Sequence, residues 1–171
     1  SLAYDAPGRA VVAWADRASG NFEVYVRRWN GVAWEELGGS GNGGGVSRTP
    51  LSSRHPSVAI DASGQPVVIW EDGSGGNSEI LGRRWNGAVW VDAGATGGGI
   101  SGTPGASTHP HLSAGPGGTV LLAVWTDLSD PQGDLEVYGK LLVNGAWREA
   151  GAASARFGGI SNNASSSSHA C

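Results

Sequence analysis

Short apolar stretches alternate along the chain with loops rich in glycine, serine and asparagine. Residues 66–72 (PVVIWED) carry four apolar side chains at consecutive positions rather than at every other position. Successive side chains of a strand point to opposite faces of its sheet, so a strand with this pattern must be covered on both faces. Eight tryptophans and 30 glycines also favour strands over helices, because glycine weakens helix interiors and tryptophan suits pleated surfaces. The pattern predicts an all-β protein.

The apolar stretches recur in a fixed order with an offset of 56 residues. Residues 1–8 (SLAYDAPG) return as 57–64 (SVAIDASG), and residues 23–31 (EVYVRRWNG) return as 79–87 (EILGRRWNG). A third, looser copy ends in LEVYGKLLVNG at 135–145. Self-similarity at a fixed period indicates a repeat architecture. We therefore interpret residues 1–171 as one unit with repeats at 1–56, 57–110 and 111–171.

Each repeat contains four strand signals, named A to D here. In the second repeat, strand A is 57–61, strand B is 66–72, strand C is 79–85, and strand D follows the pair Asn86-Gly87. An Asn-Gly pair between apolar stretches is a strong hairpin signal. We expect both residues of this pair, and both Asn30 and Gly31, to adopt positive φ. Each repeat is thus predicted to be a four-stranded meander followed by a long loop.

Three such repeats are most simply three blades of a β-propeller. Each blade of a propeller packs both faces against its neighbours, which explains the doubly apolar strands better than a sandwich or a β-solenoid does. Three blades are too few to close a ring, since propellers have four to eight. Either a second chain completes a six-bladed ring as a homodimer, or the chain is part of a longer propeller.

The phrases SVAIDASGQPVVIWED, NSEILGRRWNGAVW and GGGIS resemble a family of highly repetitive bacterial β-propellers. That resemblance covers the whole chain and implies the fold and an extracellular or cell-surface location, but no activity. The turns Trp29–Trp34 and Trp85–Trp90 are also similar to the turns of small bacterial fucose-binding propeller lectins. This second resemblance is a few residues long and implies a glycan as ligand.

Composition excludes several classes of partner. The net charge is −4, 15% of the residues are charged, and Lys140 is the single lysine, so the basic surface that nucleic acid requires is missing. No apolar run approaches the ~18 residues of a membrane span. Cys171, the one cysteine, has no partner for an intrachain disulfide. No nucleophile elbow, phosphate loop, Cys-x-x-Cys or His-Glu-x-x-His motif is present, and no cofactor is implied.

All four histidines are expected in the loop from strand D to the next strand A. These are His55, His109, His111 and His169. Imidazoles around a channel mouth would suit an anion, a metal or another ligand, and we take His55 and His109 as candidate binding residues. The alternative, which we favour, is a structural role ahead of proline in His55-Pro56 and His109-Pro110, because residues spread around a channel rarely reach the ~2 Å bonds of a metal.

Carboxylates recur at the end of strand B and the start of strand C. These are Asp16, Asp72 and Asp127, followed by Glu23, Glu79 and Glu136. A residue present in every repeat is expected to be scaffold, with hydrogen bonds from N–H groups of the B–C loop, rather than part of one catalytic site. We predict no metal site. If calcium binds, the third repeat is the place for it, through Asp127, Asp130 and Asp134.

The aromatic turns are the remaining candidates. Indole faces beside a guanidinium are what a sugar ring stacks on, and packing between blades is the alternative that we favour. The residues concerned are Trp29, Trp34, Trp85, Trp90, Arg28 and Arg84. Since such positions repeat, we expect a secreted, non-enzymatic binding or assembly module with a glycan ligand. The alternative is a glycosidase or lyase with a single site on the channel face.

Overall fold

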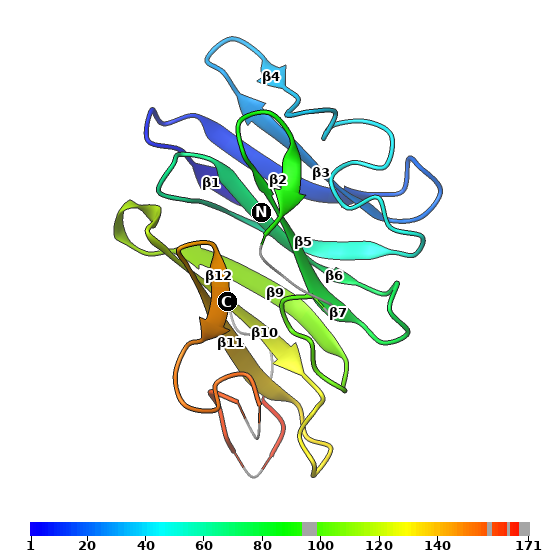
Figure 1. Cartoon of the computed structure of the whole chain (residues 1–171). Helices are drawn as coiled ribbons and strands as arrows, with labels where there is room; N and C mark the ends of the chain where they lie inside the picture. The colour runs from blue at the N-terminus through cyan, green and yellow to red at the C-terminus, as the bar shows by residue number, and fades with distance from the viewer. Residues whose placement is uncertain (94–98, 157–158, 164, 168–171) are drawn as a thin grey trace.

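The computed structural model describes all residues except 94–98, 157–158, 164 and 168–171 (Figure 1). In this described part the chain is all-β, and it contains no helix long and apolar enough to cross a membrane. The strands are β1 (Leu2–Tyr4), β2 (Ala10–Asp16), β3 (Glu23–Trp29), β4 (Trp34–Glu35), β5 (Ser53–Ile60), β6 (Pro66–Asp72), β7 (Glu79–Trp85), β8 (Trp90–Asp92), β9 (Ser107–Ala114), β10 (Val120–Asp127), β11 (Glu136–Val143) and β12 (Ala146–Glu149).

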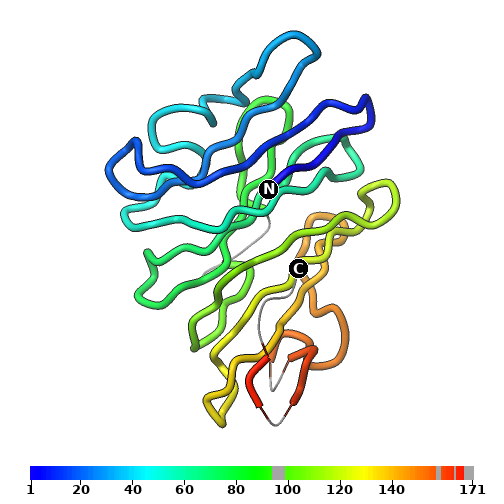
Figure 2. The backbone as a smooth tube through the Cα atoms, turned by 180° about the vertical axis from the view of Figure 1, so that it is seen from behind, coloured from blue at the N-terminus to red at the C-terminus, as the bar shows by residue number. Residues whose placement is uncertain are grey.

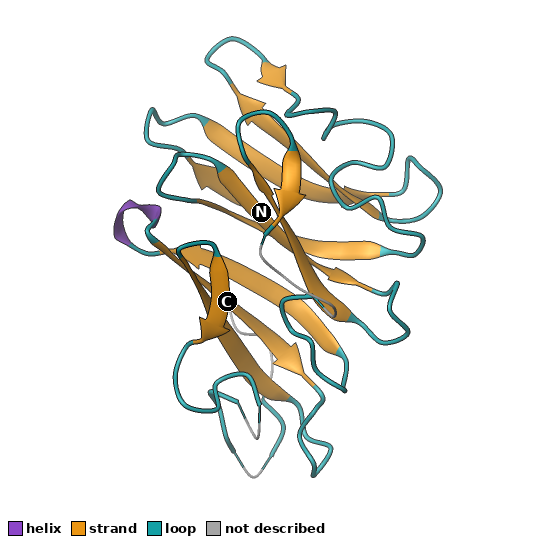
Figure 3. Ribbon diagram, in the orientation of Figure 1, coloured by secondary structure: helices purple, strands orange, loops and turns teal. Residues whose placement is uncertain are grey.

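These strands form three antiparallel sheets of four strands each, in which strands adjacent in the sequence are hydrogen-bonded neighbours. We name the sheets blade 1 (β1–β4), blade 2 (β5–β8) and blade 3 (β9–β12). Figures 1 and 2 show them following one another in chain order, and Figure 3 shows one short helical turn, η1 (Pro116–Gly118), as the exception to strands and loops. The prediction of an all-β propeller with three four-stranded blades is confirmed.

The apolar core lies between the blades. Val11 and Val24 of blade 1 pack with Val68 and Trp70 of blade 2 in one cluster. The opposite face of blade 2, which includes Ile69, packs on blade 3 in a second cluster. Blade 2 is therefore covered on both faces, as the doubly apolar strands predicted. Each large apolar side chain buried in this way contributes ~1.5–3 kcal/mol, so the contacts between blades are a main source of stability.

Strand A begins earlier than its sequence indicates. It starts at Ser53 in blade 2 and at Ser107 in blade 3, so His111 lies within β9, and His55 and His109 lie near the starts of β5 and β9. The prediction that these histidines belong to the connecting loop is wrong. His55 and His109 have positive φ, 50° and 51°, and the pairing register shifts beside them. This β-bulge absorbs the extra residues and lets pairing continue past the prolines.

Strand D is short, and the loop after it forms further hydrogen bonds with strand C. β4 has two residues and β8 has three. In blade 1 the loop returns to strand C, where Val46 N donates to Val24 O at 2.6 Å. Ile100 N donates to Ile80 O at 2.6 Å in blade 2. These bonds hold the D–A loops against the blades.

The Asn-Gly turns agree only partly with the prediction. Gly31 and Gly87 have φ of 102° and 98°, but Asn30 and Asn86 do not adopt positive φ. In blade 2 the turn spans four residues, and Asn86 Oδ1 accepts hydrogen bonds from the N–H groups of residues 88 and 89, at 2.9 Å each. The asparagine side chain thus stabilises the turn without positive φ. Only the tighter turn of blade 3 has positive φ at both residues, Asn144 and Gly145.

Candidate functional site

A hollow of about 360 Å³ lies between blades 2 and 3, at the edge of the blades that carries the A–B and C–D turns. We call this edge the turn edge and the opposite one the loop edge. Pockets for small ligands are typically about 300–1,000 Å³. The polar residues of the lining are Asp61, Ser63, Arg84, Thr119 and Asn144, and the apolar ones include Leu121 and Leu142. The hollow therefore combines convergent polar groups with an apolar wall.

A second, open hollow of about 560 Å³ adjoins the first along the inner strands. It is lined by the A strands of all three blades, and the two hollows share Asp61, Ala62 and Gly118. Tyr4 and His111 also face this hollow. The A strands thus form the concave wall that would surround a channel, as in a propeller.

Arg84 is the centre of the polar cluster. It lies on β7, and its Nε donates to Asp61 Oδ2, while a terminal guanidinium nitrogen donates to Ser63 Oγ at 2.9 Å. The other oxygen of Asp61 accepts from the backbone N–H of Ser63 at 2.8 Å and from that of Gln65 at 3.1 Å. Its contacts to Asp61 and Ser63 fix the orientation of the guanidinium, and the Arg84 side chain is still 36% exposed.

The environment of Asp61 keeps it ionised. Burial by itself would raise the pKa of this carboxyl, but the hydrogen bonds from Ser63 and Arg84 outweigh burial and leave the pKa below its ordinary value of 3.8. Asp61 is therefore an anion near neutral pH. It acts as a hydrogen-bond acceptor and not as a proton donor.

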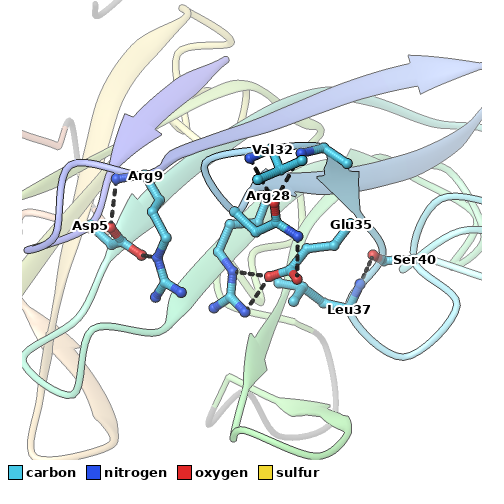
Figure 4. A network of polar contacts seen from close by, with 9 residues as sticks. Asp5, Arg9, Arg28, Val32, Glu35, Leu37 and Ser40 are labelled. Carbon is cyan, nitrogen blue, oxygen red and sulfur yellow. Dashed lines mark hydrogen bonds and ion pairs between the residues drawn. The ribbon is translucent and has the colours of Figure 1, made fainter.

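The same positions are connected differently in blade 1. Figure 4 shows Arg28, which corresponds to Arg84, paired with Glu35, with Nε to Oε1 at 2.6 Å. Asp5, which corresponds to Asp61, instead binds Arg9 at 2.7 Å. The hydrogen bond from Arg28 lowers the pKa of Glu35, against the opposing effect of its slight burial.

Blade 3 lacks both charged residues. Gly115 takes the place of Asp5 and Asp61 at the end of strand A. Leu141 takes the place of Arg84, because it pairs with Leu122 as Arg84 pairs with Val67. The arrangement of Arg84, Asp61 and Ser63 is therefore specific to the junction of blades 2 and 3.

The tryptophans of the turns lie mainly between blades. Trp85 is 7% exposed, and Trp90 Nε1 donates to Leu37 O of blade 1 at 2.7 Å. Trp29 and Trp34 form a tilted pair with ring centroids 5.7 Å apart, as Trp85 and Trp90 do. Trp34, however, is 46% exposed. The indole of the second blade thus bonds to the preceding blade, whereas that of the first faces solvent.

Two of the histidines, His55 and His109, form a stack. The rings of His55 and His109 lie 4.5 Å apart and nearly parallel. Glu71 joins them, because its Oε2 lies 3.0 Å from His55 Nδ1 and accepts from the backbone N–H of His109 at 3.2 Å. His111 lies apart from this stack in the concave hollow, and His169 is outside the described residues. The stack is near the loop edge, away from the cluster around Arg84.

The repeated carboxylates have structural roles. The backbone N–H of Ser74 donates to Asp72 at 2.9 Å, and that of Ser129 donates to Asp127 at 2.9 Å, which confirms the expected bonds in the B–C loop. The glutamates differ from the prediction, since Glu23 and Glu79 accept from hydroxyls of the D–A loop, those of Ser47 and Ser101. These hydroxyls also accept from strand C. Each glutamate thereby secures the loop that follows its blade.

The three aspartates considered for calcium do not converge. Asp127 accepts from Ser107 and Trp125 inside blade 3. Asp130 accepts from the backbone N–H of Gln132, and Asp134 from Ser166. Within the described part of the chain, no group of three His, Cys, Asp or Glu residues is placed to hold a metal ion.

Sequence reasoning identified Arg84 but missed Asp61 and Ser63 as its partners. Asp61 was expected only as the last residue of strand A, and Ser63 was not singled out. Arg84 lies 23 residues after Asp61, and nothing in the spacing indicates which carboxylate an arginine meets across two strands. The one available signal is the Asp-x-Ser pattern itself, whose side chains hydrogen-bond locally and leave the second carboxylate oxygen free.

Neither a protein-family model nor a curated protein sequence matches the chain. The chain is similar in structure to a fucose lectin from Kordia zhangzhouensis, solved with methyl-fucoside, with a TM-score of 0.51 at 15% identity. The match covers 88% of this chain and 97% of the lectin chain.

Two glycosidase structures are similar as well. One is an endo-arabinase from Bacteroides thetaiotaomicron, with a TM-score of 0.52 at 12% identity, covering 86% of this chain. The other is a glycosyl hydrolase from Bacteroides ovatus, with a TM-score of 0.52 at 11% identity, covering 91% of this chain. This chain spans 58% and 49% of their lengths. At these identities the likeness concerns the propeller fold alone.

Proposed function

We propose that the protein is a non-enzymatic carbohydrate-binding propeller module that works outside the cell or at its surface. The observation that carries the proposal is the polar cluster of Arg84, Asp61 and Ser63 at the mouth of the hollow between blades 2 and 3. Sugars present many hydroxyls and weakly apolar C–H faces. A site for them needs fixed donors and acceptors beside an apolar wall.

Each part of the cluster has a role in this proposal. The guanidinium of Arg84 donates to sugar hydroxyls or to the ring oxygen, and Ser63 and Asp61 accept from hydroxyls. Leu121 and Leu142, which are almost fully buried, form the apolar floor of the hollow beneath the C–H face of the sugar. The bond between Arg84 and Asp61 already holds both side chains in place, so binding orders few rotamers and loses less affinity to entropy. The location outside the cell rests on this ligand class.

The similar structures are a fucose lectin solved with methyl-fucoside, an endo-arabinase and a glycosyl hydrolase, and each of these names refers to carbohydrate. This agrees with a carbohydrate ligand here and leaves binding and hydrolysis to be distinguished. A glycosidase needs a carboxylic acid with a raised pKa beside a second carboxylate. Asp61 has a lowered pKa. It forms an ion pair with Arg84, and Asp5 forms one with Arg9. We therefore favour binding without hydrolysis.

A glycan-array screen with the full chain tests the proposal, followed by calorimetry on the sugar that binds best. Arg84→Ala is expected to weaken binding at least tenfold, because a charged hydrogen-bond donor typically contributes ~1.5–3 kcal/mol. Arg148→Ala removes an exposed arginine from β12 and is the matched control, with unchanged affinity.

Two results would overturn the proposal. One is the absence of binding to any glycan on the array. The other is release of free sugar from the ligand at a rate abolished by substitution of Asp5 or Asp61, which would establish the glycosidase instead. The prediction that two copies complete a ring stays separate from the sugar site, since blades 2 and 3 belong to one chain.

A further inference from the structure

We infer that blade 3 of one copy docks onto blade 1 of a second copy, head to tail, through the contacts that already join the blades within the chain. This inference extends the prediction of a two-copy ring and does not depend on the sugar site. It rests on a comparison of two internal junctions, between blades 1 and 2 and between blades 2 and 3, with the two outer faces of the arc.

The outer face of blade 3 exposes an apolar residue that is buried at both internal junctions. Val46, Ile100 and Ile160 occupy the same position, because their N–H groups donate to Val24 O, Ile80 O and Val137 O, respectively. Val46 and Ile100 are each 1% exposed, since the following blade covers them, but Ile160 is 51% exposed. Leu122 on the same face is exposed as well.

The outer face of blade 1 has the complementary feature. At the internal junctions the indole N–H of strand D donates to a carbonyl of the preceding blade, from Trp90 to Leu37 O at 2.7 Å and from Trp147 to Ala93 O at 2.8 Å. Trp34 is the corresponding indole of blade 1 and is largely exposed. The carbonyl that corresponds to Leu37 and Ala93 in blade 3 is that of Ala150, three residues after Trp147.

A cation on strand C bonds across the junction of blades 2 and 3. In blade 3, Lys140 Nζ donates to Ile100 O at 2.6 Å and to Ser101 O at 3.1 Å across the junction. Arg27 holds this position in blade 1, where a terminal nitrogen lies 3.3 Å from Glu36 Oε1 and Nε is buried without a hydrogen-bond partner among the described residues. In the docked pair, Arg27 would donate to the carbonyls of Ile160 and Ser161 of the second copy, as Lys140 donates to those of Ile100 and Ser101.

A third contact involves the segment after blade 3. Ser53 N donates to Phe22 O at 2.7 Å and Ser107 N to Ser78 O at 2.7 Å, where strand A of a new blade begins. Ser167 N makes the corresponding bond to Leu135 O, so the chain enters the position of strand A of a following blade.

The hydroxyls of these serines have a matching acceptor. Ser53 donates to Asp72 and Ser107 donates to Asp127, each within its own blade. Asp16, the corresponding aspartate of blade 1, is exposed. In the docked pair, Ser167 of one copy donates to Asp16 of the other.

These features fit a second copy of this chain as the occupant of the two outer faces. Both faces carry one half of a junction that the chain forms twice internally, and the matching half is on the opposite face of the same molecule. A head-to-tail contact of this kind generates a closed ring when the rotation closes. With three blades per copy, two copies form six blades and two identical seams, which lies within the range of known propellers.

Sedimentation equilibrium over a wide concentration range is the first measurement, and the unaltered chain is expected to have twice the mass of one copy. Trp34→Ala damages one face and Ile160→Asp the other. Because each seam of a symmetric pair contains one copy of every face, either variant damages both seams. Dissociation constants are expected to rise roughly 100-fold, about tenfold for each seam. Val89→Asp, at an exposed turn position, is the control with unchanged mass.

Mixing the two damaged variants tests the head-to-tail geometry. The Ile160 face of the Trp34→Ala copy meets the Trp34 face of the Ile160→Asp copy in one intact seam. The other seam carries both changes, whose losses at one small contact are expected to be less than additive, so the mixture is expected to associate more tightly than either variant alone. Circular dichroism checks that both variants remain folded.

Several outcomes would overturn the inference. These are a monomeric unaltered chain at all concentrations, a dimer that neither substitution weakens, and a dimer sensitive to Trp34→Ala alone, which would indicate face-to-face docking of two first blades. If a variant does not fold, the mass of the unaltered chain still decides. Arg84→Ala is expected to retain the mass of the unaltered chain, so loss of sugar binding and loss of assembly are distinguishable.

Discussion

Asp72 accepts buried hydrogen bonds within blade 2, and their contribution to stability can be tested directly. Its Oδ2 accepts from Ser53 Oγ at 2.8 Å and from Trp70 Nε1 at 3.1 Å, and its Oδ1 accepts from Ser74 N at 2.9 Å. Asp72, Ser53 and Trp70 are all buried. One carboxylate therefore joins strand A, strand B and the B–C loop.

Truncation by Asp72→Ala removes the acceptor and leaves two buried donors, the indole N–H and the serine hydroxyl. Each unsatisfied buried donor costs ~1–3 kcal/mol, so we expect the free energy of unfolding to fall by about 3 kcal/mol. Asp72→Asn keeps one carbonyl oxygen in the same place, and its loss should be about half as large.

Urea unfolding followed by far-UV circular dichroism measures this change at one fixed protein concentration. Asp92→Ala is the matched control, because Asp92 is an exposed aspartate on β8 of the same blade, and surface substitutions usually change stability by less than ~0.5 kcal/mol. Equal losses for Asp72→Ala and Asp92→Ala would show that the buried bonds contribute nothing, and the reasoning would fail.

Two further expectations concern a turn and the response to acid. Gly87→Val should destabilise by roughly 1 kcal/mol or more, because a β-branched residue is strained at the observed φ of 98°; Gly75→Val, at a loop position without positive φ, is the control, and an unchanged melting temperature for Gly87→Val would contradict the turn geometry. Asp61 and Asp72 both have pKa values below the ordinary 3.8, since their hydrogen bonds outweigh the effect of burial. A lowered folded-state pKa stabilises the fold above the unfolded value and loses this contribution as the pH falls through the folded one. Stability should therefore decline below about pH 4, and Asp72→Asn should make the decline shallower; an identical decline in the variant would exclude Asp72 as a source.

Much of the architecture follows from local pattern. The period of the repeat, the four strands per repeat and the burial of both faces were all readable from the sequence, because side-chain alternation and turn residues act over a few positions. The errors lie where the backbone departs from the usual geometry. The bulge at His55 extends strand A beyond the expected start, and nothing in His-Pro distinguishes a bulge from a loop.

The candidate site was likewise only partly predictable from the sequence. Arg84 was identifiable as a cation beside an aromatic turn, whereas its pairing with Asp61 depends on how β5, its turn and β7 lie side by side. Arg28 lies in the same RRWNG motif but pairs with Glu35 of the adjacent strand. At the equivalent position in blade 2, Val91 stands opposite Arg84. Identical motifs thus acquire different partners, since the neighbours that decide the pairing come from other strands.

By itself, the sequence determined the fold class and the number of blades, because these depend on periodicity and composition. Only the tertiary structure decided which face each apolar residue occupies. Val46, Ile100 and Ile160 hold equivalent positions along the chain, yet two are buried and one is exposed. Burial is a property of what packs against a residue, and in a repeat protein that depends on the neighbouring blade.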